Sequence, residues 1–495
     1  MTFSSLAFTA ADVQAAVAKE LETGAPDRLL RKAAAGLAVH CTAELETRYG
    51  RVYGRRVALL VGTGNNGADA LLAGIILRRR GVRVAAFLTG DTAYAPGLTK
   101  LRAAGGRIID ADTEIDAATC ALAAADLVVD GIVGESGAGP LRGRAAQLVT
   151  ALPNVPVIAV DLPSGTESDT GEIAGLHVQA DITVTFGAWK AATFLPPASG
   201  ACGELRFVDV GLPGIPGEPR VRRLTDRGVA QLWPRPTRIS HKYLRGVVGV
   251  VAGSDRYPGA AVLACMGAAE SGAGIVRFIG PQGTTDHVLN EVPESVPGTG
   301  QVQAWLLGSG VDNDPSQDAA IDAALSSGQP CVIDAGALEA CVRQRVNGHR
   351  RARADQLLLT PHAGELARML SLIGRPVERA EVEDQPLRHG LELAEAIDAT
   401  VLVKGATTIV VRPDGYVASQ AEAPPWLATA GAGDVLAGIA GALMAGGLGA
   451  FDAGEMAAFI HGRAAARAHT DRHGGPITAS AVARALPSVI GEILD

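Results

Sequence analysis

Short runs of β-branched residues and leucine alternate with alanine- and leucine-rich stretches of helical period through residue 210. Strands that alternate with helices are typical of βαβ units in a mostly parallel sheet, where the loops at the strand carboxyl ends carry function. The predicted strands are 57–61, 82–88, 127–130, 157–161, 182–186 and 205–210, and the predicted helices include 68–80, 101–104 and 144–152.

The alternation stops at GLPGIPGEPRV, where three prolines and three glycines fall within eleven residues. Such a composition favours an exposed linker. No internal repeat relates the two halves, so we predict two different α/β domains, over residues 1–212 and 225–495, joined by a linker over 213–224. Beyond the linker the predicted strands are 247–252, 275–279, 305–308, 331–334, 356–360 and 401–404, and two long alanine-rich helices follow.

The composition of the 495 residues is that of a globular protein, with 47% hydrophobic and 19% charged residues and a net charge of −8. One basic cluster, residues 343–353, is best explained as a solvated loop, so no nucleic-acid partner is expected. The six cysteines are scattered, which predicts free thiols in a reducing compartment. No signal peptide or membrane-length apolar run is expected, so we predict a cytoplasmic protein without a membrane partner, assembled as a homo-oligomer.

The first glycine-rich turn follows the strand RRVALLVG, where Gly62, Gly64 and Gly67 fit the pattern GxGxxG. A strand that runs through such a turn into a helix directs backbone N–H groups and the positive end of the helix at an anion. The turn also holds Asn65, Asn66 and Asp69, which are more polar than a bare pyrophosphate loop requires. An alternative is that Asn65 and Asp69 only cap the turn and the helix.

Two more predicted strands end in an aspartate, at Asp130 and Asp161. A loop with five glycines follows Asp130, and a tight turn through Pro163, Ser164 and Gly165 follows Asp161. Adjacent strand ends of a parallel sheet open onto one crevice. Asn66, Asp130 and Ser164 could then offer oxygen ligands to a hard monovalent or divalent cation.

The motifs GNNGAD, DGIVGESGAG and VDLPSGT, in this order and spacing, resemble the NAD(P)H-hydrate epimerase domain over roughly residues 10–212. The resemblance implies an acid/base role for Asp161 and a potassium ion held by Asn66, Asp130 and Ser164. Ala68 and Ala70 stand where the family has glycines, and each would add a methyl group close to the ligand. The implied hydrate-binding residues are Asn65, Asn66, Gly67, Ala68, Asp69, Gly134, Glu135, Ser136, Gly137, Ala138, Gly139, Pro140 and Asp161.

The C-terminal motif is ATAGAGDVLAGIAGAL, a glycine-rich turn that opens a long apolar helix. The amides of residues 431–433 would form an anion hole, and Asp434 could take or give a proton at a substrate hydroxyl. GAGD at the start of a late helix resembles the ribokinase-like superfamily, so we predict a ribokinase-like α/β fold here and a Rossmann-like three-layer fold in the N-terminal half. The alternative is that Asp434 only caps the helix after a flexible turn.

Four further segments, SHKYLRGVVGVVAGSDRYPGAAVLA, LLGSGVD, LLLTPHAGELARML and LVKGATTIVV, resemble the nucleotide-dependent NAD(P)H-hydrate dehydratase over roughly residues 225–490. The resemblance implies ADP as co-substrate, with Mg²⁺, and AMP and phosphate as products. Ala430 and Ala432 depart from the family motif toward that of sugar and vitamin kinases. Glu365 follows His362 by three residues, but without a second such pair a metal site is not expected. The implied hydrate contacts are Ala260, Gly310, His362 and Asp434, and the implied nucleotide contacts are Lys404, Gly405, Ala406, Thr407, Thr408 and Gly433.

These resemblances predict a bifunctional enzyme that acts on the hydrates of NADH and NADPH. One half would interconvert the R and S epimers, and the other would dehydrate the S form. Two alternatives remain at this point: a ribokinase-like vitamin or hydroxymethylpyrimidine kinase, and a catalytic C-terminal half regulated by a non-catalytic nucleotide sensor. The fusion favours repair, because both resembled domains act on the same damaged cofactor.

Overall fold

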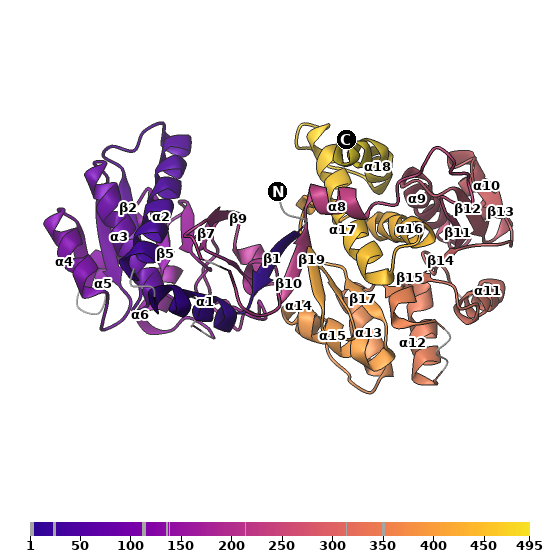
Figure 1. Ribbon diagram of the computed structural model, residues 1–495, viewed down its shortest axis with the longest axis horizontal. Helices are drawn as coiled ribbons and strands as arrows, with labels where there is room; N and C mark the ends of the chain where they lie inside the picture. The colour runs from indigo at the N-terminus through magenta and orange to yellow at the C-terminus, as the bar shows by residue number, and fades with distance from the viewer. Residues whose placement is uncertain are drawn as a thin grey trace. The chain divides into compact units, whose positions relative to one another are not determined.

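The computed structural model describes residues 4–22, 26–110, 115–134, 137, 139–212, 214–312, 314–348 and 352–495 (Figure 1). The chain separates into two compact units, Leu6–Val221 and Arg222–Asp495, the second of which also takes the residues up to Ser5. The division lies inside the segment predicted as a linker. Residues 221–224 of that segment form a strand, β10 (Val221–Leu224), and are not an irregular connection.

The N-terminal unit is built on a seven-stranded, all-parallel sheet in the order β4-β3-β2-β5-β6-β7-β9. The central strands β2 (Arg56–Val61), β5 (Leu127–Gly131) and β6 (Val157–Val160) are almost wholly buried, as expected for parallel strands covered on both faces. A short parallel pair, β1 with β8, lies apart from this sheet. The other strands are β1 (Ser4–Phe8), β3 (Arg83–Leu88), β4 (Arg107–Asp110), β7 (Ile182–Phe186), β8 (Trp189–Lys190) and β9 (Glu204–Val208).

Helices cover both faces of this sheet, which gives three layers (Figure 1). Leu59 of β2 packs with Leu37 of α2 and Leu71 of α3, whereas the neighbouring Leu60 packs with Leu122 of α5 on the other face. Side chains alternate between the faces of a strand, so one apolar run supplies both cores. The helices are α1 (Ala10–Glu22), α2 (Pro26–Tyr49), α3 (Asn65–Arg79), α4 (Ala95–Ala103), α5 (Ile115–Ala123), α6 (Gly143–Thr150) and α7 (Ala198–Ala201).

The C-terminal unit holds a mixed sheet in the order β13-β12-β11-β14-β15-β16-β17-β18-β19-β10. The strands from β13 to β17 are parallel, and β17, β18 and β19 form antiparallel pairs. The predicted α/β class is therefore confirmed in both halves. The strands are β11 (Val247–Val251), β12 (Ile275–Ile279), β13 (Val296–Pro297), β14 (Ala304–Leu307), β15 (Cys331–Ile333), β16 (Leu357–Leu359), β17 (Thr400–Val403), β18 (Thr408–Val411) and β19 (Val417–Gln420).

The helices of this unit again lie on both faces of the sheet (Figure 1). Leu402 and Val410 belong to the main core with α16 and α17, while Gly390 of α15 faces the alternate residue Val403. In the part of the chain that the structure describes, no helix combines the length and apolarity needed to cross a membrane. The helices are α8 (Asp226–Leu232), α9 (Pro258–Glu270), α10 (Gln282–Glu291), α11 (Pro315–Ser326), α12 (Leu338–Val346), α13 (Ala363–Leu372), α14 (Arg379–Asp384), α15 (Pro386–Ile397), α16 (Ala432–Ala445), α17 (Ala450–Thr470) and α18 (Ala479–Leu494).

Helices α9 and α16 approach each other backbone to backbone. A Cβ atom built on Gly267 would lie 2.5 Å from the carbonyl oxygen of Val435, and one built on Gly438 would lie 2.3 Å from that of Ala264. Real side chains do not tolerate such distances, so both positions require glycine. The contact holds α16, and with it the GAGD turn at its N-terminus, against α9.

Candidate active sites

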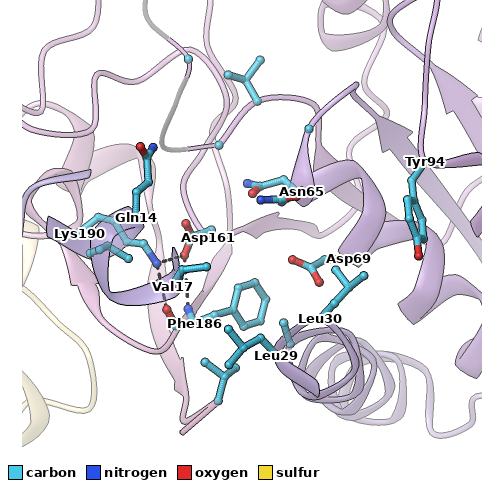
Figure 2. A pocket seen from close by; sticks show the side chains of 18 of the residues that line it. Gln14, Val17, Leu29, Leu30, Asn65, Asp69, Tyr94, Asp161, Phe186 and Lys190 are labelled. Atoms are coloured by element: carbon cyan, nitrogen blue, oxygen red, sulfur yellow. Dashed lines mark hydrogen bonds and ion pairs between the residues drawn. The ribbon is translucent and has the colours of Figure 1, made fainter. Parts of the chain in front are cut away.

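A cavity of about 770 Å³ opens in the N-terminal unit at the carboxyl ends of β2, β5 and β6 (Figure 2). Apolar side chains of α1 and α2, including Val17 and Leu29, form one part of its lining. Polar side chains from the strand ends and α3 form another part. The titratable residues in the described part of this lining are Asp69, Tyr94, Asp161 and Lys190.

Asp161 lies directly after β6 with a φ of +70°, a left-handed conformation that aspartate tolerates better than most residues. Its Oδ1 atom accepts hydrogen bonds from the Lys190 ammonium, from the Thr185 hydroxyl at 2.9 Å and from the Phe186 amide at 3.3 Å. Lys190 is 2% exposed, so this is a buried ion pair. Lys190 was not among the residues predicted from the sequence. A lone lysine in the apolar segment FGAWKAATFL was the available signal.

Asp69 lies in the second turn of α3 and is 7% exposed. The N-cap residue of α3 is Gly64, with no side-chain capping bond, so the interpretation of Asn65 and Asp69 as caps is wrong. Asp69 Oδ1 has no hydrogen-bond partner among the described residues. Burial, and then the nearby Asp161 carboxyl, hold the pKa of Asp69 well above its ordinary value, although Lys190 opposes the shift.

The three predicted cation ligands come from neighbouring strand ends. Ser164 Oγ donates to Asp130 Oδ1 at 2.6 Å, and the Ser164 amide donates to Asp130 Oδ2 at 2.8 Å. The Asn66 amide group donates to the Val160 carbonyl at the end of β6. Asp130 is fully buried, and burial raises its pKa to about 6.

The remaining predicted epimerase residues divide into three groups. Gly134 and Gly137 line the cavity, whereas Gly67, Ala68, Gly139 and Pro140 do not. A Cβ on Gly67 would lie 2.2 Å from the Gly62 carbonyl oxygen, so Gly67 serves the closure of the turn. Ala68 and Ala70 are buried and are not among the residues that line the cavity, so the approach of their methyl groups to the ligand stays a prediction. Glu135, Ser136 and Ala138 lie outside the described residues.

In the C-terminal unit Asp434 lies in the first turn of α16, behind a left-handed Gly431 with a φ of +87°. Gly431 is the N-cap and Asp434 makes no capping bond, so the capping alternative is wrong here too. Burial, followed by the charge of Asp334, raises the pKa of Asp434 to about 7, and Lys404 opposes this rise.

Lys404 joins the neighbouring strand ends to this turn. Its Nζ donates to Asp334 Oδ1 at 2.9 Å and lies 3.7 Å from Glu365 Oε2. Burial disfavours the lysine charge, but these two carboxyls outweigh it and raise the pKa of Lys404. A Cβ on Gly433 would lie 3.4 Å from the same Nζ, which places the ammonium beside the N-terminus of α16.

Asp334 is a second aspartate of this site that the sequence analysis did not select. Its two oxygens accept hydrogen bonds from Thr360 at 2.8 Å and from Ser309 at 3.0 Å, in addition to Lys404. Asp334 directly follows a buried strand, β15, in the way that Asp130 ends β5. An aspartate at the end of a predicted strand, the pattern that identified Asp130 and Asp161, would therefore also have identified Asp334.

His362 is the N-cap of α13 and forms a capping box with Glu365. Its Nδ1 accepts from the Gly364 amide at 3.0 Å, and Glu365 Oε2 accepts from the His362 amide at 2.8 Å. Burial lowers the pKa of His362. The spacing noted in the sequence is thus explained by helix capping, which also brings Glu365 to Lys404.

The other predicted dehydratase residues lie in two groups outside the GAGD turn. Gly310 has a φ of +69°, and a Cβ built on it would lie 2.5 Å from the Cβ of Ala260, so these two predicted hydrate contacts are neighbours. The turn between β17 and β18 carries the other predicted nucleotide contacts. In it Gly405 and Ala406 are exposed, Thr407 is buried and Thr408 is partly buried.

Comparison with known proteins bears on both halves. Residues 248–488 match the family model of NAD(P)H-hydrate dehydratase, and residues 26–192 match that of the YjeF-related protein N-terminus. A bifunctional NAD(P)H-hydrate repair enzyme from Mycobacterium tuberculosis is 41% identical over 440 residues, which cover 86% of each chain. The chain belongs to the family of bifunctional NAD(P)H-hydrate repair enzymes.

Other members of the repair-enzyme family are more distant. The one from Corynebacterium glutamicum is 31% identical and covers 84% of this chain and 82% of its own. Among solved structures, the ADP/ATP-dependent NAD(P)H-hydrate dehydratase from Bacillus subtilis, co-crystallised with ATP and Mg²⁺, is 27% identical with a TM-score of 0.49, over 54% of this chain and 97% of that one. The two family models and the curated relatives confirm the family predicted from the motifs, and the kinase alternative is not favoured.

Proposed function

We propose that this chain repairs hydrated NAD(P)H in two steps. The N-terminal unit interconverts the R and S epimers, and the C-terminal unit dehydrates the S form with ADP, giving NAD(P)H, AMP and phosphate. One observation carries the proposal: two strand-end sites, each with paired carboxyls and a lysine, lie in segments that match the two halves of one repair enzyme. We also propose a cytoplasmic homo-oligomer. All six cysteines are free, which supports a reducing compartment.

The C-terminal geometry suits activation of a hydroxyl by phosphoryl transfer. Asp434 would take the proton of the substrate hydroxyl as its oxygen attacks the β-phosphorus of ADP, and AMP would leave. The amides at the start of α16 and the Lys404 ammonium would stabilise the charge on the phosphoryl group. The lone pair of the ring nitrogen then expels phosphate, and loss of a ring proton restores the dihydropyridine.

Mg²⁺ would neutralise charge on the nucleotide phosphates. Among the described residues, no group of three or more His, Cys, Asp and Glu side chains could hold a metal ion. Asp334, the most buried carboxylate here, has both oxygens occupied by Lys404, Thr360 and Ser309. These residues therefore fit an ion that arrives on the nucleotide and keeps several water ligands, rather than a dedicated protein site.

In the N-terminal unit Asp161 is suited to proton transfer. Its hydrogen bonds from described residues all go to Oδ1, which leaves Oδ2 as the atom available to a substrate in the cavity. The apolar side chains of α1 and α2 would cover the nicotinamide ring and exclude water from it.

A potassium ion would be held by oxygen atoms of Asn66, Asp130 and Ser164. The donor set fits, because these side chains supply hard oxygens and the partners of the buried Asp130 carboxyl are a hydroxyl and backbone amides. A bound ion would fix the loop after Asp130 against the turn after Asp161.

Replacing K⁺ by Li⁺ should slow conversion of the R epimer several-fold, leave dehydration of the S epimer unchanged, and lower the thermal midpoint of the N-terminal unit. An unchanged midpoint and rate would refute the ion's role.

The proposed function is tested by mixing the protein with hydrated NADH and ADP and following the reduced-nicotinamide absorbance. The wild type should recover both epimers. Asp161→Asn, which keeps a side chain that tolerates a positive φ, should recover the S portion at the wild-type rate and the R portion only at its spontaneous rate. No ADP-dependent recovery of the S epimer would overturn the dehydratase assignment. Equal R rates with and without wild-type protein would overturn the epimerase assignment.

A further inference from the structure

The N-terminal cavity contains a second carboxyl group that the acid/base role of Asp161 leaves unused. In Figure 2 the Asp69 carboxyl points from α3 into the cavity, toward the side on which Asp161 and Lys190 lie. It is 7% exposed, and its Oδ1 has no partner among the described residues. A buried carboxyl kept for structure alone is normally hydrogen-bonded, since leaving a polar group unpaired costs free energy.

The two carboxyls differ in their surroundings. Asp161 accepts three hydrogen bonds, one of them from a buried ammonium, whereas none of these donors reaches Asp69. Among the described residues, the other titratable groups that line the cavity are Tyr94 and Lys190. When the surroundings of two neighbouring carboxyl groups differ in this way, one group can act as the acid and the other as the base.

We propose that Asp69 is the general acid of the epimerase reaction, acting on the substrate hydroxyl while Asp161 is the base for the incoming water. This inference rests on the proposed epimerase function. The raised pKa of Asp69 supports it, because burial and the neighbouring Asp161 charge both favour the protonated form of Asp69.

The reaction balances with water as the only co-reactant. Asp69 gives its proton to the hydroxyl on the carbon next to the ring nitrogen, and the C–O bond breaks with its electron pair on oxygen, so water leaves. The nitrogen lone pair forms a C=N bond, and the cation is stabilised by the carboxylates. A second water adds from the opposite face, its proton passes to Asp161, and the C=N electrons return to nitrogen. Asp161 then releases this proton to solvent and Asp69 takes one up from solvent, which restores the starting state. The reverse epimerisation uses the two residues in exchanged roles.

The first test is Asp69→Asn in the full-length protein. Conversion of the R epimer should fall roughly 10²- to 10⁴-fold, the usual contribution of a positioned acid. Dehydration of the S epimer should keep the wild-type rate, because it occurs in the other unit. The substitution removes a buried ionisable group without a partner, so the thermal midpoint should not fall. Glu46→Gln, at an exposed position of α2, is the control and should change neither rate.

The pH profile distinguishes a proton donor from a structural residue. Asp69 acts in its acid form and Asp161 as the carboxylate, so the wild-type R rate should decline as pH rises through the raised pKa of Asp69. Asp69→Asn should lose that decline as well as most of the rate. A variant with the wild-type rate and profile would overturn the inference while leaving the epimerase function standing. A wild type that does not accelerate R conversion at all would instead remove the function on which the inference rests.

An isotope experiment tests the bond that breaks. In H₂¹⁸O each inversion should place one labelled oxygen on the product, measured at times short against spontaneous exchange. Inversion without label would overturn protonation of the hydroxyl by Asp69, because ring opening at the C–N bond retains the original oxygen. Labelled product from wild type, together with a slow Asp69→Asn variant, supports the proposal.

Discussion

Asp434→Asn is expected to reduce ADP-dependent recovery of the S hydrate roughly 10²- to 10⁴-fold, which is the usual effect of removing a positioned base. Asparagine has nearly the same shape and Asp434 makes no capping bond, so α16 and the anion site at its N-terminus should persist. Calorimetric titration should show nearly unchanged nucleotide affinity. Asp414→Asn, in the exposed turn between β18 and β19, is the matched control and should leave turnover unchanged. Wild-type turnover in Asp434→Asn would show that the carboxyl is not the base.

The raised pKa of Asp434 also sets the sign of the pH dependence. The carboxylate is the base, so kcat/KM of the dehydratase should rise with pH through about 7 and then level off. The effect on stability has the opposite sign: a carboxyl with a raised folded pKa favours the folded state at low pH, and this contribution is lost as pH rises through about 7. Asp434→Asn should therefore be at least as stable as wild type at pH 8.

Lys190→Met is expected to destabilise the N-terminal unit by about 3–5 kcal/mol. The lysine is 2% exposed and its ammonium pairs with Asp161, so its loss leaves a buried carboxylate without a cation and beside Asp69. Denaturant unfolding should show the loss. R-epimer conversion should fall as well, because Asp161 is no longer held.

A double variant separates the ion pair from simple packing. Lys190→Met combined with Asp161→Asn removes both charges, so it should regain much of the stability that Lys190→Met loses. Methionine fills a volume similar to that of the lysine stem. Additive losses in the double variant would mean that the pair contributes no coupling free energy and that Lys190 acts through packing alone.

The strands and the fold class were predictable because buried parallel strands are continuous apolar runs. Each predicted strand overlaps an observed one. The edge strand β4, with only Ile108 and Ile109 between charged ends, was missed because an edge strand needs little apolar surface. Pairing across the sheet, which sets the order of the strands, follows from contacts far apart in the chain.

The site residues were predictable where glycines and polar side chains share one turn, as in residues 62–69 and 431–434. Lys190 and Asp334 were missed because they belong to no such turn. Each had only a weak local signal, a lone lysine in an apolar segment and an aspartate at a strand end, and its partner is distant in the chain: Lys190 lies 29 residues from Asp161, and Asp334 lies 70 residues from Lys404. These pairings could not be predicted from local sequence.

The glycine contact between α9 and α16 limits how the C-terminal half can diverge. At Gly267 and Gly438 the two helix backbones come too close for a Cβ atom, so no larger residue can be accommodated at either position without moving the helices apart. The N-terminus of α16, which carries Asp434, is thereby held by a contact with α9 that any substitution at these two positions would disrupt. New substrate preferences in this half must arise in the loops at the strand ends, such as the exposed turn at Gly405 and Ala406, while the paired helices stay as they are.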